Sequence, residues 1–325
     1  MESHLVCTSH SPILYLRPEK PDYEDEIFRV LAERRAAVEA FDPGIAFVFG
    51  ADHYAGFHLN AMPAFCVGRG EAVAVDDVGG FPGPLDVDGA AGLGLLEYLR
   101  AEGFDPAQSL KMTVDHGFSQ TMKNVMGALD AFPCVPVFIG AMATPFLPFR
   151  RSRELGAAVG RYAATLGKRV LFLASGGLSH HPARYYPPLG EGSPEVAAWQ
   201  MEGSAGGTFT DDEWFRNLFD MHVEGARMLA DGRRTRAQVR LNPEVDRAFL
   251  DILASGDLAL LDAWDIGALF ETAGMGFAEV HGWIAAAAAH LACGGGAPTV
   301  DFYRDTLEYA IGYGIAHADR PARVS

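Results

Sequence analysis

Four histidines occupy positions where α/β proteins place ligand-binding groups. His10, His53 and His180 each follow a short run of apolar and β-branched residues that is typical of a buried strand. His116 lies in a turn-like segment that precedes a predicted helix. Ligands of parallel sheets bind beyond the carboxyl ends of the strands, so side chains that follow such strands can meet at one site. A single histidine among the 11 of the chain would mean little, but four in equivalent places indicate a site.

Two of these histidines suit a metal ion that must bind both a substrate and O₂. Two neutral imidazoles and one carboxylate on one face of iron(II) leave three positions open. His10 and His53 are the imidazole candidates, from strand ends that we expect to be adjacent. Glu279 is the carboxylate candidate because it lies in an apolar, alanine-rich helical segment, where an inward carboxylate needs a partner. A solvated position at a helix start explains Glu279 equally well, so the residues alone leave this ligand open.

The remaining polar groups near these histidines suggest proton transfer and orientation. His116 and His180 stay unligated in this scheme, and imidazoles move protons near neutral pH. Asp52 and Asp115 each precede a key histidine and are candidates to orient an imidazole. Adjacent side chains often point apart, however, so a turn or capping role explains them as well. His181 is either part of the site or only a neighbour of His180.

A basic cluster formed by Arg150, Arg151 and Arg153 stands out in an acidic chain. It could meet a carboxylate of a substrate. A solvated helix start is the interpretation that we prefer, because arginines of this kind usually face water.

The elements that must position these residues alternate between strands and helices in the first part of the chain. Strands are predicted at residues 5–8, 45–50, 64–68, 135–140 and 169–175, and helices around 27–38, 93–99 and 155–162. After about residue 194 the pattern is helical alone, over 212–230, 242–255 and 276–292. We therefore expect an α/β fold in a single domain of residues 1–325, with a mostly parallel central sheet, helices on both faces and a helical C-terminal third.

Residues 182–207 are rich in Pro, Gly and Tyr, and they predict a long loop that covers the site.

Composition excludes several kinds of partner. The formal net charge of -16 disfavours binding to nucleic acid or to an anionic membrane, so a small-molecule substrate is expected. The cysteines are far apart and lack disulfide-type spacing, which indicates reduced core residues. The sequence starts without a basic and apolar leader pattern, and we expect a cytoplasmic protein.

Taken in order, the motifs resemble those of the type II, or class III, extradiol ring-cleavage dioxygenases. The segments that carry the resemblance are Ser9-His10-Ser11-Pro12, Asp52-His53-Tyr54, Val114-Asp115-His116-Gly117-Phe118, Ser175-Gly176-Gly177-Leu178-Ser179-His180 and residues 279–283, with further matches at 83–88, 241–244 and 253–258. The similarity covers nearly the whole chain.

The resemblance implies a function for each group. His10, His53 and Glu279 would ligate iron(II), and His116 and His180 would serve as acid and base, in an order that the sequence leaves open. The reaction would be O₂-dependent opening of a 3-substituted catechol beside its hydroxyls, by a homo-oligomer. It is the resemblance, not the spacing, that selects Glu279.

Two departures from the family pattern concern the substrate. Val245 stands where related sequences carry tryptophan, and the segment 183–207 is unlike theirs. A smaller side chain at Val245 would enlarge a pocket if the position faces one. Pro182, which follows His181, is a further candidate for contact with the substrate.

Three other functions remain open at this stage. The same chemistry could act on another catechol or on an aminophenol. A metal-dependent hydrolase uses similar ligands but would usually carry the helical HExxH spacing, which this chain lacks. A binding protein that has lost its metal would be expected to lack some of the five groups, all of which are present.

Overall fold

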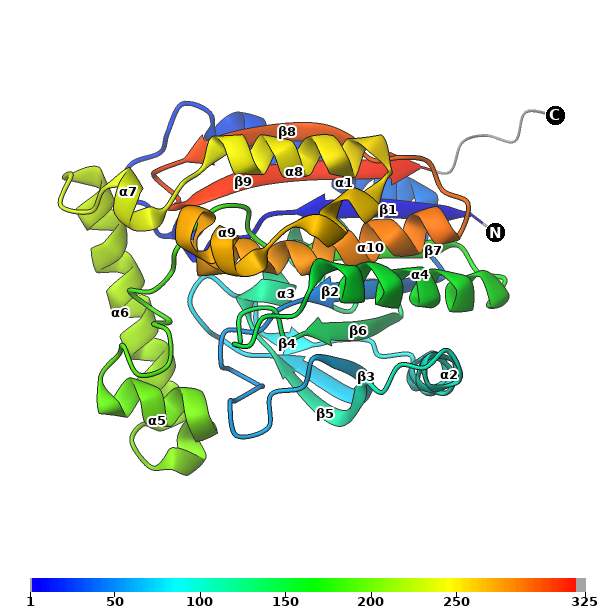
Figure 1. Cartoon of the computed structure of the whole chain (residues 1–325), viewed down its shortest axis with the longest axis horizontal. Coiled ribbons are helices and arrows are strands. Elements are labelled where there is room, and N and C mark those ends of the chain that lie inside the picture. Colours follow the sequence, from blue (N-terminus) through cyan, green and yellow to red (C-terminus); the bar gives the residue numbers. More distant parts are fainter. Residues whose placement is uncertain (1, 320–325) are drawn as a thin grey trace.

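One nine-stranded β-sheet crosses the protein, as shown in Figure 1 by a computed structural model that describes residues 2–319. The strands are β1 (Ser3–Thr8), β2 (Ile45–Gly50), β3 (Phe65–Ala74), β4 (Gly83–Pro84), β5 (Ala107–Val114), β6 (Cys134–Ile139), β7 (Val170–Ser175), β8 (Thr299–Thr306) and β9 (Ile311–Asp319). Their order is β4-β3-β6-β2-β7-β1-β9-β8, and β5 pairs with β3.

The centre of the sheet is parallel and buried on both faces. Strands β6, β2, β7 and β1 run in one direction, and every residue in them is buried. Strands covered on both sides must be apolar throughout, and this is why these segments could be predicted as strands from the sequence. The expectation that β1 and β2 are neighbours was wrong, because β7 lies between them. The ends of β1 and β2 therefore flank the end of β7.

The sheet is mixed, so the prediction of a mostly parallel sheet was wrong. Strand β3 is antiparallel to β6 and to β4, and β9 is antiparallel to β1 and to β8. The C-terminal third is also not helical alone, because β8 and β9 form an antiparallel hairpin at its end. Gly312 and Gly314 weaken the strand signal of β9, since glycine has low strand propensity. Glycine is needed at position 312, because a Cβ there would lie 2.2 Å from an Asp246 oxygen.

Helices cover both faces of the sheet, as expected. They are α1 (Glu24–Phe41), α2 (Gly89–Ala101), α3 (His116–Met126), α4 (Phe149–Thr165), α5 (Pro194–Glu202), α6 (Asp211–Ala230), α7 (Arg236–Val239), α8 (Pro243–Ser255), α9 (Ile266–Ala273) and α10 (Val280–Ala292), with 3-10 turns η1 (Pro12–Tyr15), η2 (Gly203–Gly206), η3 (Leu258–Ala263) and η4 (Met275–Glu279). Helices α4 and α10 pack with Leu5 and Cys7 of β1, whereas α1 and α3 pack with Val6 on the opposite face. Figure 1 shows α5 and α6 as an arm at the left of the view, beyond the ends of the strands.

The segment 182–207 is not the uninterrupted loop that was predicted, because it contains α5 and η2. Ser193 caps α5 by accepting a hydrogen bond from Val196 N–H, and Pro194 occupies the first turn. A serine cap followed by proline is a helix-start signal that the loop-like composition obscured. No helix among residues 2–319 is long and apolar enough to cross a lipid bilayer.

Helices α4 and α10 approach so closely that their backbones are nearly in contact. A Cβ at Gly156 would lie 2.0 Å from Ala285 O, and one at Gly160 would lie 2.1 Å from Ala289 O. Glycines on α4 and alanines on α10 make this contact possible. The contact matters for the site because Glu279 directly precedes α10.

We expect Gly160→Ala to lower the free energy of unfolding by about 1–3 kcal/mol, because the added methyl group has no space against α10. Helix propensity alone would predict the opposite effect, because alanine in place of glycine raises the free energy of unfolding by about 1 kcal/mol. Urea denaturation measures the difference, and Ala164→Ser on the exposed face of α4 is the control. A variant as stable as the wild type would contradict the close packing.

Candidate active site

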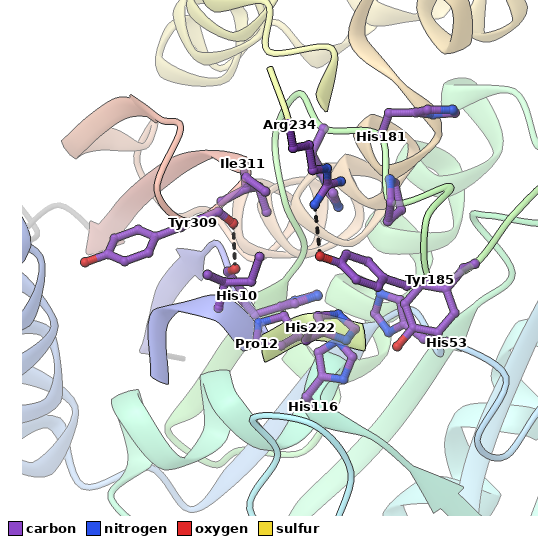
Figure 2. A pocket seen from close by; sticks show the side chains of 16 residues that line it. His10, Pro12, His53, His116, His181, Tyr185, His222, Arg234, Tyr309 and Ile311 are labelled. Carbon is purple, nitrogen blue, oxygen red and sulfur yellow. Dashed lines mark hydrogen bonds between the residues drawn. The ribbon is translucent and has the colours of Figure 1, made fainter. Parts of the chain in front are cut away.

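The five residues selected by the sequence meet at the carboxyl edge of the central strands. His10, His53 and His180 follow β1, β2 and β7, and His116 is the first residue of α3 after β5. Glu279 lies where η4 joins α10. All five are buried, with exposed fractions between 1% and 8%. Figure 2 shows His10, His53 and His116 lining one pocket.

The carboxylate of Glu279 is the centre of this group. Its oxygens lie 3.3 Å from His10 Nε2, 3.4 Å from His53 Nε2 and 3.4 Å from His180 Nε2. Gly177 N–H donates a hydrogen bond of 2.9 Å to Oε2. The side chain does not face water, because Glu279 is 1% exposed. The alternative of a solvated helix start is therefore excluded.

Each candidate ligand histidine has a second contact that fixes its ring. His10 Nδ1 lies 2.9 Å from Ser175 Oγ, which also accepts a hydrogen bond from Thr121. His53 Nδ1 lies 3.1 Å from Asp115 Oδ2. In both rings Nδ1 is engaged and Nε2 faces Glu279, an arrangement that metal-binding histidines commonly show.

Asp115 and Asp52 differ in role. Asp115 caps α3 through Gly117 N–H and contacts His53, not its sequence neighbour His116. Asp52 accepts hydrogen bonds from the backbone N–H groups of residues 55, 56 and 57, so it stabilises a turn. The turn explanation thus holds for Asp52, and the orienting explanation describes Asp115.

His116 is held by Asp77, a residue that the sequence did not indicate. Its Nδ1 contacts the carboxylate of Asp77, which is itself buried. The His116 ring stacks on that of His53, with centroids 4.3 Å apart. Asp77 precedes His116 by 39 residues in the sequence, and nothing in the local pattern around it signals this contact.

The segment of His180 is positioned by its backbone and by Asp246. His180 Nδ1 lies 2.8 Å from Leu178 O, so that nitrogen is the donor and Nε2 is left for the site. Asp246 accepts hydrogen bonds from Ser179 N, Ser179 Oγ and Tyr303 OH, and burial raises its pKa to about 6. A Cβ at Gly276 would lie 2.1 Å from the His180 ring, so only glycine fits there.

The pocket beside these groups encloses about 430 Å³ of space between its walls, part of which is open to solvent. Its further walls include His181, Pro182, Tyr185, Tyr186, His222 and Arg234. The beginning of the segment 182–207 therefore does line the site. His222, Arg234 and the two tyrosines were not predicted.

Some candidates lie elsewhere. Val245 is on α8, packed against the core, and is not among the described residues that line the pocket. Arg150 and Arg151 pair with Glu154, and Arg153 pairs with Asp262. The solvated-helix interpretation therefore describes the arginine cluster.

The donor set fits a divalent metal ion. Two ligands bound about 2.1 Å from one ion at right angles are about 3 Å apart, close to the separations between Glu279 and the two imidazoles. Burial alone would lower the pKa of His53, yet Asp115 and Glu279 raise it well above its usual value. The carboxylates of Asp115 and Glu279 therefore favour a positive charge at His53. Nitrogens of His10, His53 and His116 also lie within 4.8 Å of one another, an alternative set for the same ion.

Comparison with known proteins identifies the family. Residues 4–310 match the family described as the catalytic LigB subunit of aromatic ring-opening dioxygenase. The chain belongs to this LigB family. The match confirms the resemblance to extradiol dioxygenases, and the chain is accordingly a ring-opening dioxygenase of a family whose members depend on a metal ion.

Curated LigB relatives match over almost their full length. A protein of Mycolicibacterium gilvum named 2,3-dihydroxyphenylpropionate/2,3-dihydroxicinnamic acid 1,2-dioxygenase is 43% identical, over 97% of both chains. Relatives with the same name from Azotobacter vinelandii and Burkholderia vietnamiensis are each 38% identical over 98% of this chain, and over 100% and 98% of their own lengths.

Two matched substitutions distinguish the two possible ligand sets. Asp115→Asn should lower metal affinity about 10- to 100-fold, because Asp115 orients His53. Asp77→Asn, which releases His116, should leave metal content unchanged while kcat falls. Bound iron is measured after anaerobic loading and desalting. Loss of metal from Asp77→Asn would indicate that His116, and not Glu279, completes the site.

Proposed function

We propose that this LigB protein is an iron(II)-dependent extradiol dioxygenase that opens 3-substituted catechols of the 2,3-dihydroxyphenylpropionate type. Both oxygen atoms of O₂ would enter a hydroxymuconic semialdehyde-type product. The observation that carries the proposal is the contact of buried Glu279 with His10 and His53. Beside them lie His116, held by Asp77, and His180, held by Leu178 O. The names of the relatives support the substrate type.

His10, His53 and Glu279 would hold the iron. Iron(II) in such a site supplies positions for the two catechol oxygens and for O₂, and it lets electrons pass between ring and oxygen. The protein contributes by fixing the ligands in advance. Ser175 and Asp115 hold the two imidazole rings, and Gly177 N–H holds the carboxylate.

We assign proton transfer to His180 and His116. His180 Nδ1 is bound to Leu178 O, so its Nε2 is the atom that accepts a proton from a catechol hydroxyl. His116, held at Nδ1 by Asp77, donates a proton when the ring opens. Tyr186 and Pro182 also line this pocket, and their side chains would limit the access of water to reactive species.

The other parts of the proposal concern the whole protein. We place it in the cytoplasm because Cys7, Cys66 and Cys134 are buried thiols without disulfide partners, as in a reducing compartment. The resemblance to the family implies a homo-oligomer.

The test is O₂ uptake with absorbance scanning after anaerobic loading with iron(II). We expect uptake and a yellow product with 3-(2,3-dihydroxyphenyl)propionate, weaker activity with catechol, and a product mass equal to substrate plus O₂. Protein without iron is the control. Absence of uptake with every catechol and aminophenol, despite bound iron, would refute the proposal.

A further inference from the structure

The pocket contains a buried arginine that the proposed chemistry does not use. Arg234 lies in the connection between α6 and α7, is 6% exposed, and lines the same pocket as His10 and His180. Its Nη1 donates a hydrogen bond of 2.9 Å to Tyr185 OH. Figure 2 shows the Arg234 side chain directed toward Tyr185, on the side of the view opposite to His116.

Arg234 has no counter-ion within the part of the chain that the structure describes. Its contacts there are the Tyr185 hydroxyl, the Tyr185 ring at 5.2 Å from Cζ, and a backbone hydrogen bond to Met228 O. By contrast, Arg240 also lies over an aromatic ring, that of Phe270, but it is paired with Glu271. Buried charges in proteins are normally paired, because a lone one loses its hydration without compensation. The missing partner of Arg234 is therefore expected to be a ligand.

The surroundings of Arg234 form a closely packed and otherwise neutral wall. Tyr185 stacks on His222 with ring centroids 3.7 Å apart, and His222 Nδ1 lies 2.7 Å from Leu218 O. A Cβ at Gly225 would lie 2.0 Å from Tyr185 OH, so this glycine makes room for the phenol. Burial lowers the pKa of His222 to about 3 and that of His181 to about 4. At neutral pH these imidazoles are uncharged, and the guanidinium supplies the positive charge of this wall.

We propose that Arg234, positioned by Tyr185, binds a carboxylate on the side chain of the catechol substrate. Guanidinium groups recognise carboxylates through two parallel hydrogen bonds, a geometry that fixes orientation as well as charge. The inference rests on the proposed function and deepens it. Because Arg234 lines the same pocket as His10 and His180, a catechol whose ring lies at the Glu279 site would bring an anionic side chain to the guanidinium. The pocket would then favour anionic catechols over neutral ones.

The decisive comparison uses two substrates that differ in the carboxylate. For 3-(2,3-dihydroxyphenyl)propionate, Arg234→Gln should lower kcat/KM about 30- to 100-fold, mainly through KM, because a buried charged hydrogen bond is lost. For 3-propylcatechol the change should stay below about threefold, since the ring chemistry is intact. Arg234→Lys keeps the charge without the paired geometry and should recover part of the difference. Arg240→Gln is the matched control and should alter neither substrate.

A second measurement does not depend on iron or on catalysis. Metal-free wild-type protein should bind 3-phenylpropionate in calorimetry, and Arg234→Gln should lose this binding while circular dichroism stays unchanged. Equal loss of kcat/KM for both substrates, or unchanged binding of 3-phenylpropionate by Arg234→Gln, would overturn the inference. If the wild type opens no catechol at all, the proposed function fails, and the calorimetry still decides whether Arg234 binds a carboxylate. If Arg234→Gln does not fold, Arg234→Lys gives the same comparison with a smaller expected effect.

Discussion

A carboxylate excluded from water must be compensated by the groups around it, and the contacts of Glu279 show how much of this fold serves that need. Imidazoles reach Glu279 from three strand ends, and a backbone N–H completes the contacts. The close packing of α4 on α10 fixes the helix that Glu279 precedes. The imidazoles from the strand ends and the packing of α4 on α10 both act on Glu279. A change in either contact is therefore expected to affect the site.

The sequence predicts the centre of the fold better than its edges, for a physical reason. Strands β2 and β7 are buried on both faces, so they must be apolar throughout and are easily recognised. Strand β5 is half exposed and polar, and β9 is rich in glycine, so neither carries a strong pattern. The direction of a strand within the sheet is harder still to predict. The antiparallel pairing of β9 with β1, for example, joins residues from opposite ends of the chain.

The residues of the site also differ in how well the sequence predicts them. His10 and His53 could be predicted because they follow strong strand signals, whereas Glu279 needed the family resemblance. The contacts that support them were harder to predict, since each acts on a residue far away in the sequence. Asp115 was a candidate to orient an imidazole, but the ring that it contacts is not that of its neighbour His116. Asp115 serves His53 across 62 residues, and Asp77 serves His116 across 39. Arg234 lies in a polar connection whose local sequence looks like an ordinary exposed turn.

The segments of His180 and Glu279 are also joined by their backbones. Gly276 N–H donates a hydrogen bond of 3.0 Å to His180 O, and a Cβ at Gly274 would lie 2.1 Å from the same oxygen. This direct backbone contact helps to keep the separation of the two functional groups. An engineer who transplanted this chemistry to another scaffold would have to move both segments as one piece, glycines included.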